Sequence, residues 1–445
     1  MKNAVHRKPP VLNFLRVAVA ITLAVLLSSL LLQIAQAADQ TAMLGGDPAR
    51  SGVQPGPAPT GDLTATTLAD QTGYSSLEPV ILGSTLYRMV ALPATSAAES
   101  AGRAIEAINL ASGTSLWTKP LPDGLGNPNT GLAIMNDLLF YVSSTHDQTT
   151  GESDSLVAFN IADGTATWSV PVGRRSGAYS GSPVVKNGVV YWVDLDGTAY
   201  AVIADTGKVV WTSTGAKAVK SPFADDNLNI SGVVSSVQFA LDDHQLYLSN
   251  SDGDLAALKL SDGALTWSFN VAQRFGVTVN SIDPRVYDGG VFLSISAIDP
   301  SDATHASFSL IASLKPTTGG VAWKQFLPQN STGGSVVNGL AILSFYRAGS
   351  DGQDVVAYDL TSGKTVWSYA SRYIGAADAG IAVVGDAAYV TGTGGFVIQL
   401  GLHDGKAAVR YEFPDPVVPA QSMFISGGRI ALVGANGALV ILATK

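Results

Sequence analysis

The sequence predicts an all-β fold, an eight-bladed β-propeller of four-stranded antiparallel sheets. One eleven-residue pattern recurs seven times, and its tryptophans lie 43 to 56 residues apart. That spacing matches the ~40–50 residues of a four-stranded propeller blade. The apolar runs between them are short and bounded by Gly, Asn and Asp, and no helical periodicity appears after the amino-terminal segment, which favours strands joined by tight turns.

Each copy of the pattern has a small residue, an apolar residue, a turn with Gly, and usually Trp four residues later. An oxygen-bearing Ser, Thr or Asp precedes the Gly in every copy and is able to hydrogen-bond the backbone of a tight turn. Gly supplies the positive φ that such a turn needs. The copies occupy 107–117, 158–168, 201–211, 257–267, 313–323, 357–367 and 399–409.

A second, weaker unit precedes each copy, an apolar run, a short turn and another apolar run, best seen at 182–194. Together the two units predict four strands, named A to D from first to last. Seven complete units run from about Leu77 to Pro414. The tail, 420–445, supplies three strands of an eighth unit, and residues 61–69 form a lone strand-like run. We expect this run to complete the last blade, because closure removes an open sheet edge.

The recurrent tryptophans are expected to be structural, because a large ring near the outer strand can wedge into the neighbouring blade and bury ~150–250 Å². Ala six residues before Gly leaves room for close approach of the sheets. The seventh copy carries Val409 in place of Trp, and Trp192 lies outside the pattern. The structural tryptophans are Trp117, Trp168, Trp211, Trp267, Trp323 and Trp367.

Residues 1–37 are interpreted as a signal peptide. Lys2, Arg7 and Lys8 precede an apolar run, and Ala35-Gln36-Ala37 forms a small-residue cleavage site. An uncleaved membrane anchor is the alternative, since a span needs ~20 apolar residues. Either way we expect an exported protein, extracellular, periplasmic or bound to the cell envelope. Residues 38–60 are predicted to be an irregular Gly- and Pro-rich lead-in along the surface, and residues 61–445 to be the propeller.

Composition excludes several classes of function. The 445 residues carry 26 Lys and Arg against 35 Asp and Glu, a net charge of −9, and contain no Cys. A charge-poor acidic chain is a poor binder of nucleic acid, which requires a basic surface. Without Cys there are no disulfides, thiolate metal sites or Cys nucleophiles. A membrane is expected to be contacted only through the amino-terminal segment, and the chain is expected to be monomeric.

The Gly-x-x-x-Trp repeat, with Asp or Thr before several of its glycines, resembles that of the pyrroloquinoline-quinone-type (PQQ-like) β-propellers. The lead-in GGDPARSGVQPGP also resembles the segment that precedes such propellers in exported bacterial proteins. The family includes quinoprotein dehydrogenases and the outer-membrane assembly factor BamB. This resemblance implies the propeller fold over about residues 40–445. It does not by itself imply an activity, because one fold supports many functions.

The resemblance is specific for the fold and implies no cofactor here. Quinoprotein dehydrogenases hold the quinone with calcium, an aspartate base and usually a vicinal Cys-Cys disulfide, and no segment of this chain aligns with those residues. We therefore expect neither PQQ nor calcium, and no catalytic residues. A quinoprotein dehydrogenase remains the alternative. BamB itself is anchored through an amino-terminal Cys that is absent here, so its specific role does not follow.

Other motifs are weaker. His146, His244, His305 and His403 fall in different repeats without metal-ligand spacing. The loops at Asp194–Gly197 and Asn250–Asp254 resemble calcium loops, but the closing Glu of the twelve-residue pattern is missing. Asp-Gly at a B–C turn is ordinary hairpin chemistry.

The lengths of the predicted connections differ between the two faces of the ring. The A–B and C–D turns are uniformly short, whereas nearly all long segments are B–C or D–A connections on the opposite face. We call these the plain face and the elaborated face. Long loops on a rigid scaffold usually carry binding. The D–A connections should ring the central opening as a cationic, aromatic mouth, and the candidate residues are Lys119, Arg174, Arg175, Tyr179, Lys217, Lys220, Phe223, Arg274, Phe275, Arg372 and Tyr373.

The mouth would suit a carboxylate-bearing polymer, an acidic peptide or another anionic group. The alternative is solvated loop charge, partly offset by Asp123, Asp225 and Asp226. The sequence therefore predicts a non-catalytic binding or scaffold protein with a protein or anionic-ligand partner. A purely structural spacer is a third interpretation.

Overall fold

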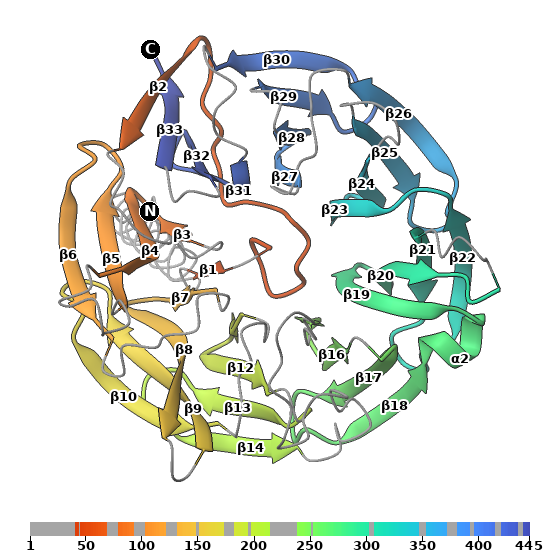
Figure 1. Ribbon diagram of the computed structural model, residues 1–445, viewed down its shortest axis with the longest axis horizontal. Coiled ribbons are helices and arrows are strands. Elements are labelled where there is room, and N and C mark those ends of the chain that lie inside the picture. The colour runs from red at the N-terminus through yellow and green to blue at the C-terminus, as the bar shows by residue number, and fades with distance from the viewer. Residues whose placement is uncertain are drawn as a thin grey trace, which may run out of the picture. The chain divides into compact units, whose positions relative to one another are not determined.

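Eight antiparallel sheets stand side by side around a central axis in the computed structural model (Figure 1). We number them blades 1 to 8 along the chain. The strands of each blade run in sequence order from axis to rim, except in blade 8, where an amino-terminal strand lies outermost. The structure describes residues 41–43, 45–68, 79–92, 103–121, 131–147, 151–172, 182–194, 197–213, 238–250, 252–301, 307–346, 353–371, 381–391, 396–413, 420–434 and 439–445.

The first four blades each contain strands A to D in chain order. Blade 1 has β3 (Val80–Leu82), β4 (Thr85–Ala91), β5 (Arg103–Asn109) and β6 (Ser115–Pro120). Blade 2 has β7 (Ala133–Met135), β8 (Leu138–Asp147), β9 (Gly151–Asn160) and β10 (Ala166–Pro171). Blade 3 has β11 (Val184–Lys186), β12 (Val189–Val193), β13 (Ala199–Ile203) and β14 (Val209–Ser213). Blade 4 has β15 (Gln238–Leu241), β16 (Gln245–Ser249), β17 (Asp254–Lys259) and β18 (Leu265–Asn270).

The last four blades repeat this arrangement. Blade 5 has β19 (Thr278–Tyr287), β20 (Gly290–Ile298), β21 (Ser307–Leu314) and β22 (Val321–Leu327). Blade 6 has β23 (Ser331–Val337), β24 (Leu340–Tyr346), β25 (Gln353–Asp359) and β26 (Thr365–Ser371). Blade 7 has β27 (Ile381–Val384), β28 (Ala387–Thr391), β29 (Phe396–Gly401) and β30 (Ala407–Glu412). Blade 8 has β31 (Ala420–Ser426), β32 (Arg429–Gly434), β33 (Leu439–Thr444) and β2 (Leu63–Leu68).

Blade 8 confirms the predicted closure of the ring. Strand β2 pairs antiparallel with β33 over six residues, from Leu63 opposite Thr444 to Leu68 opposite Leu439. The two ends of the propeller chain therefore share one sheet (Figure 1). The expected all-β class also holds, with one local exception among the residues that the structure describes. A five-residue helix, α2 (Val271–Phe275), follows β18. Five residues are too few to show a helical period in the sequence.

The core lies between the blades, where the faces of neighbouring sheets meet. Residues on the inner and middle strands are almost all buried, whereas outer strands such as β6 and β18 alternate exposed and half-buried residues. This alternation is typical of a strand with one face on a neighbouring sheet and the other in water. The apolar residues of each four-stranded blade are thus buried on the inner and middle strands and partly exposed on the outer strand.

The repeated tryptophans each cross to the next blade. Trp211 on β14 donates its indole N–H to the carbonyl of Leu260 in blade 4 at 2.8 Å. Its ring lies against Gly263 of the same C–D turn, where φ is +70° and an added Cβ would stand 2.6 Å from the ring. The same N–H to carbonyl bond, at 2.6–2.9 Å, is made by Trp117, Trp168, Trp267, Trp323 and Trp367.

The constant spacing within the repeat now has a physical reason. Gly serves twice, because it adopts the positive φ of its own turn and leaves a flat surface for the preceding blade's indole. The cross-strand partner of Trp211 is Ala201, which is fully packed, and Ala107, Ala158, Ala257 and Ala357 take the same place in other blades. The prediction that these tryptophans pack between blades is confirmed. We call this contact the indole latch.

The lead-in takes a different path from the one predicted. Residues 41–60 do not lie along the outer surface but run through the centre of the ring (Figure 1). Strand β1 (Thr41–Met43) pairs with β7 of blade 2. The following residues then accept or donate backbone hydrogen bonds to the inner strands of blades 4 to 8 in turn, as in Leu241 N–H to Pro48 O at 2.8 Å and Val383 N–H to Gly52 O at 2.9 Å. The reason is that inner strands carry unpaired backbone groups that need partners.

Arg50 anchors the lead-in from inside. Its side chain is buried and donates to the carbonyls of Ser182 at 2.8 Å and Phe239 at 3.3 Å, with the guanidinium 5.6 Å from the Phe239 ring centre. Gly52 sits so close to blade 6 that an added Cβ would stand 2.0 Å from the Ser335 hydroxyl. The backbone of the Gly-rich lead-in thus lies very close to the inner strands.

Substituting Gly263 tests the indole latch. We expect Gly263→Ala to lower the free energy of unfolding by about 1–3 kcal/mol more than Gly339→Ala, because overpacking adds to the backbone strain. Both glycines have positive φ, but a Cβ at Gly339 meets nothing within 4 Å. Urea unfolding of both variants measures the difference. In a Trp211→Leu background the excess should shrink, and equal losses for the two variants would contradict the latch.

Substituting Arg50 tests the hub. We expect Arg50→Met to lower the free energy of unfolding by about 2–3 kcal/mol, because two buried carbonyls lose a charged donor. The control is Arg429→Met, which removes an exposed bond to the Gly427 carbonyl and should change the stability by less than about 0.5 kcal/mol. Indistinguishable denaturation midpoints for the two variants would show that the lead-in is not anchored by Arg50.

Candidate functional site

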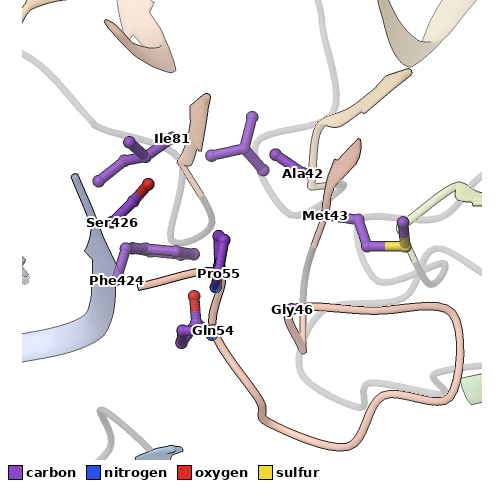
Figure 2. Close-up of a pocket in the computed structure, with 9 residues that line it drawn as sticks. Ala42, Met43, Gly46, Gln54, Pro55, Ile81, Phe424 and Ser426 are labelled. Atoms are coloured by element: carbon purple, nitrogen blue, oxygen red, sulfur yellow. The ribbon is translucent and has the colours of Figure 1, made fainter. Parts of the chain in front are cut away.

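The lead-in crosses the central opening and bonds to the inner strands around it. Figure 2 shows Gln54 and Pro55 of the lead-in beside Phe424 of β31, with Met43 and Gly46 on the other side of the same pocket. The gap left between them has a volume of about 10 Å³, which is room for about one water molecule. Between the lead-in, β3 and β31, the hub is therefore packed closely and holds no ligand-sized cavity.

A larger hollow lies on the plain face, beside the lead-in. It has a volume of about 950 Å³ and is bordered by Asp47–Ala49 of the lead-in and by turns of blades 3 to 6. Its charged lining comprises Asp47, Lys186, Asp242, Asp243, His244 and Asp288. We call it the plain-face hollow.

Several carboxylates of the plain-face hollow serve the fold. Asp243 forms an ion pair with Lys186 at 2.8 Å, which joins blades 4 and 3. Asp242 accepts the Tyr247 hydroxyl at 2.6 Å and two backbone N–H groups. Burial raises the pKa of Asp47, while hydrogen bonds from Ser51 oppose that rise. These carboxylates thus already have structural partners, and no acid–base pair is apparent among them.

A second hollow lies on the elaborated face, at the rim between blades 4 and 5. Helix α2 reaches from the end of β18 to the neighbourhood of β22 (Figure 1). The hollow has a volume of about 540 Å³ and is lined by Phe275, Gly276, Val277, Asp299, Ser307, Phe308, Phe326, Leu327 and Pro328. We call it the rim groove.

Helix α2 is held in place by a capping network. Asn270 accepts the Gln273 N–H at its N-terminus and also donates to the Asp252 carbonyl and to the Asp254 carboxylate at 2.8 Å. Gly276, with φ of +71°, ends the helix. Val271, the first residue of the helix, is fully buried. The position of Phe275 in the rim groove is therefore fixed by the B–C turn of blade 4.

Aromatic rings and cations meet at the rim groove. Phe308 and Phe326 lie with their ring centres 5.8 Å apart, and Phe326 is 50% exposed. The Lys324 ammonium lies 4.6 Å from the centre of the Phe275 ring and 5.3 Å from that of Phe326. Arg274 lies 4.4 Å above the Phe269 ring. The groove thus combines apolar ring faces with positive charge.

The two loops that resemble calcium sites use their carboxylates internally. Asp194 accepts the Thr198 N–H at 2.7 Å and the Tyr200 hydroxyl at 3.2 Å. In the other loop, the Asn250 side chain accepts the N–H groups of Asp252 and Asp254. Burial and the nearby Asp254 raise the pKa of Asp252. These contacts fit ordinary turn chemistry.

The structure places three of the eleven predicted mouth residues. Lys119 lies on the outer strand β6, beside Trp117 and near Gly164 of blade 2, and not in a D–A connection. Arg274 and Phe275 lie on α2, over the outer strands at the rim. Only these last two are brought together. The other eight lie outside the described residues: Arg174, Arg175, Tyr179, Lys217, Lys220, Phe223, Arg372 and Tyr373.

Sequence reasoning missed the remaining members of the rim groove. Lys324 and Phe326 follow Trp323 at alternate positions of an outer strand, and both face water. Such positions carry polar or small residues in most copies, so an exposed Phe after the Trp was a usable signal. Phe308 stands at the start of a C strand and carries no distinctive pattern.

Neither a metal cluster nor a membrane-spanning helix is found in the described part of the chain. Among the residues with described positions, no three His, Asp or Glu side chains are grouped to hold a metal ion. Within the same ranges, no helix has the length and apolar character needed to span a bilayer. His244 lines the plain-face hollow, whereas His305 lies outside the described residues.

Comparisons with known proteins agree with the architecture. A family model described as "Outer membrane protein assembly factor BamB" matches residues 101–298 and 307–445. The BamB protein of Yersinia pestis is 24% identical over 291 residues, which cover 62% of this chain and 67% of that protein. The tetrathionate hydrolase of Acidithiobacillus ferrooxidans is 22% identical over 293 residues, 61% of this chain but only 55% of the enzyme.

A solved structure gives the same fold at lower sequence identity. The quinohemoprotein alcohol dehydrogenase of Comamonas testosteroni superimposes with a TM-score of 0.57 at 14% identity, over 91% of this chain and 80% of that one. A likeness at this level concerns the fold alone. The repeat with its indole latches, the closed ring of eight blades and the matched family model lead to one conclusion: the chain belongs to the BamB family of PQQ-like β-propellers.

Proposed function

We propose that this protein is an exported, non-catalytic binding or scaffold protein of the cell envelope or exterior. It would hold a protein segment or an anionic ligand on its elaborated face. Its rigid ring would fix the position of the loops, so that little conformational entropy is lost when a partner binds.

The course of the lead-in across the hub is the observation that carries this proposal. The axis is the one place where residues from all eight blades converge, and an enzyme built on the ring would have the most side chains available there. In this chain the lead-in occupies that place on the plain face, with Arg50 committed to backbone carbonyls. Binding is then left to the faces and the rim, where long loops lie.

The placement in the envelope is supported by the relatives and by the amino terminus. One relative is named as an outer membrane protein assembly factor, and residues 1–37 have the features of a signal peptide. The tetrathionate hydrolase matches this chain over only part of its own length, so its activity does not carry over with the shared repeats.

The predicted mouth stays part of the proposal. Its two members with described positions, Arg274 and Phe275, lie on α2 at the rim and not around the central opening, and Phe275 lines the rim groove. The remaining cationic candidates, such as Arg174, Arg175 and Arg372, would extend the positive surface along the elaborated face. A carboxylate-bearing partner would then meet several cations in succession.

Cross-linking from two positions tests the scaffold function. A photoreactive amino acid is placed at Gln273 on α2 or at Asp205 in a C–D turn of the plain face, both exposed. In intact cells we expect a discrete adduct from Gln273 and none from Asp205, since only the elaborated face would meet the partner. An adduct from Asp205 alone would move the binding site to the plain face. No adduct from either position would favour a structural spacer.

A dye-reduction assay tests the quinoprotein alternative. The purified chain is supplied with PQQ, calcium, an artificial electron acceptor and a panel of alcohols and sugars. We expect no dye reduction above the control without PQQ, because the centre of the ring is occupied by the lead-in. The Comamonas enzyme is the positive control. Reduction that depends on PQQ and substrate would overturn the non-catalytic assignment.

A further inference from the structure

We propose that the rim groove is a docking site for an extended peptide that carries acidic residues beside an aromatic or large aliphatic side chain. The inference rests on the proposed scaffold function and names the class of partner. It also assigns roles to Lys324, Phe326 and Phe308, which the predicted mouth did not include.

The apolar part of the site is a pocket between three rings. Phe275 comes from α2 and Phe308 and Phe326 come from β21 and β22, so two neighbouring blades contribute. Phe326 is 50% exposed, and its ring lies 5.8 Å from that of Phe308. Exposed rings around one hollow of about 540 Å³ gain contact area when a large side chain enters, because buried aromatic surface dominates many interfaces.

The charged part of the site is Lys324, whose ammonium lies over the faces of Phe275 and Phe326, two of the rings that line the groove. Arg274 lies over Phe269 and donates to the Gly319 carbonyl at 3.4 Å, so it stands beside the groove and not in its lining. No ion pair of Lys324 with a described carboxylate is found in the placed part of the chain. A cation held by ring faces keeps its charge available for an incoming carboxylate, and a charge-assisted hydrogen bond there would be stronger than a neutral one.

The lining also contains one acidic residue, at a different point of the groove. Asp299 accepts the Ser301 N–H at 2.8 Å and the Ser301 hydroxyl at 2.6 Å. Its charge therefore lies on the B–C connection of blade 5, whereas Lys324 lies on the outer strand. This polarity favours a bound segment whose carboxylates lie toward β22, because like charges beside Asp299 would repel.

The backbone beside the groove favours an extended partner. Strand β22 is the last strand in its sheet and has no further strand paired to it within the described residues. An edge strand presents unpaired N–H and C=O groups at every second residue, and a peptide in extended conformation can add to them. Side chains of such a peptide alternate, so that those on one face would meet Lys324 and Phe326.

The test is direct binding measured by fluorescence anisotropy. The probe is a fluorescein-labelled ten-residue acidic peptide with two phenylalanines, and its controls replace the acidic residues by Lys or the phenylalanines by Ala. We expect the full chain to bind the probe and to bind each control about tenfold or more weakly, since each control removes one of the two contacts.

Matched variants locate the site. Lys324→Glu and Phe326→Ser should each weaken binding by about tenfold or more. The controls are Lys208→Glu, the same charge change on a plain-face turn, and Val366→Ser, which removes an equally exposed apolar side chain (49%) from outer strand β26. Both controls should stay within about twofold of the wild type. All four positions are exposed, so unchanged thermal melting should accompany each variant.

The outcomes separate the groove from the scaffold function. No binding of the probe, or equal weakening by all four variants, would overturn the rim groove. Binding of anionic vesicles that is lost in Lys324→Glu, without binding of the peptide, would assign the groove to a membrane surface and would also overturn it. If the Gln273 adduct persists in cells when Lys324 and Phe326 are substituted, the groove assignment fails while the scaffold function stands. Probe binding without any adduct in cells would support the groove and contradict the scaffold function.

Discussion

The indole latch between neighbouring blades is the contact on which the ring depends. Each latch joins a Trp from one outer strand to a C–D turn of the next blade, through one hydrogen bond and a flat contact with Gly. The two residues constrain each other, because any side chain at the Gly would displace the indole and a smaller residue than Trp would leave the turn carbonyl unpaired. The contact therefore explains why the sequence repeats Gly and Trp four residues apart, and why most of the turn's other residues vary.

Two of the eight junctions lack the latch, and both involve the closing blade. Between blades 7 and 8, Val409 stands where the other copies have Trp, and blade 8 has no C–D turn because its outer strand comes from the other end of the chain. Between blades 8 and 1, the outer strand β2 of blade 8 contains no Trp. Other contacts serve there. A buried ion pair of Arg88 and Glu106, at 3.0 Å, lies in blade 1 on the sheet face that carries Leu86 and Ile108, which pack against blade 8. The ion pair joins two strands of blade 1, so the contact across this junction is made by the apolar cluster in which Leu86 and Ile108 meet Phe424 and Ile441 of blade 8.

Much of the fold could be predicted because its cause is local and repeated. The turn residues and the Trp spacing each follow from one local requirement, a tight turn or a contact between blades. The carboxyl-terminal unit lacks one strand, and residues 63–68 supply it by pairing with the carboxyl-terminal strand, as predicted. The lead-in could not be predicted so well, because its partners are backbone groups of six inner strands that share no side-chain pattern. The rim groove was missed for a related reason. Phe308 and Phe326 come together through the pairing of β21 with β22 in blade 5, and Phe275 joins them from the helix that connects blades 4 and 5. Asn270 and Gly276, by contrast, flank α2 as recognisable caps, a signal that sequence reasoning had available.

The lead-in across the hub and the latches between blades limit the positions at which a residue can be substituted without loss of stability. Residues in the latches and along the axis are fixed by contacts on both sides, so their substitution affects stability before it affects binding. Exposed residues on the outer strands do not make these stabilising contacts. Lys324 and Phe326 stand directly after a latch Trp, on a strand whose position is fixed by Trp323 and its bond to the Leu360 carbonyl. The backbone at these positions is held by the latch, although the side chains do not contribute to it. A substitution at these exposed positions therefore changes the surface beside the rim groove and leaves the contacts of the ring unchanged.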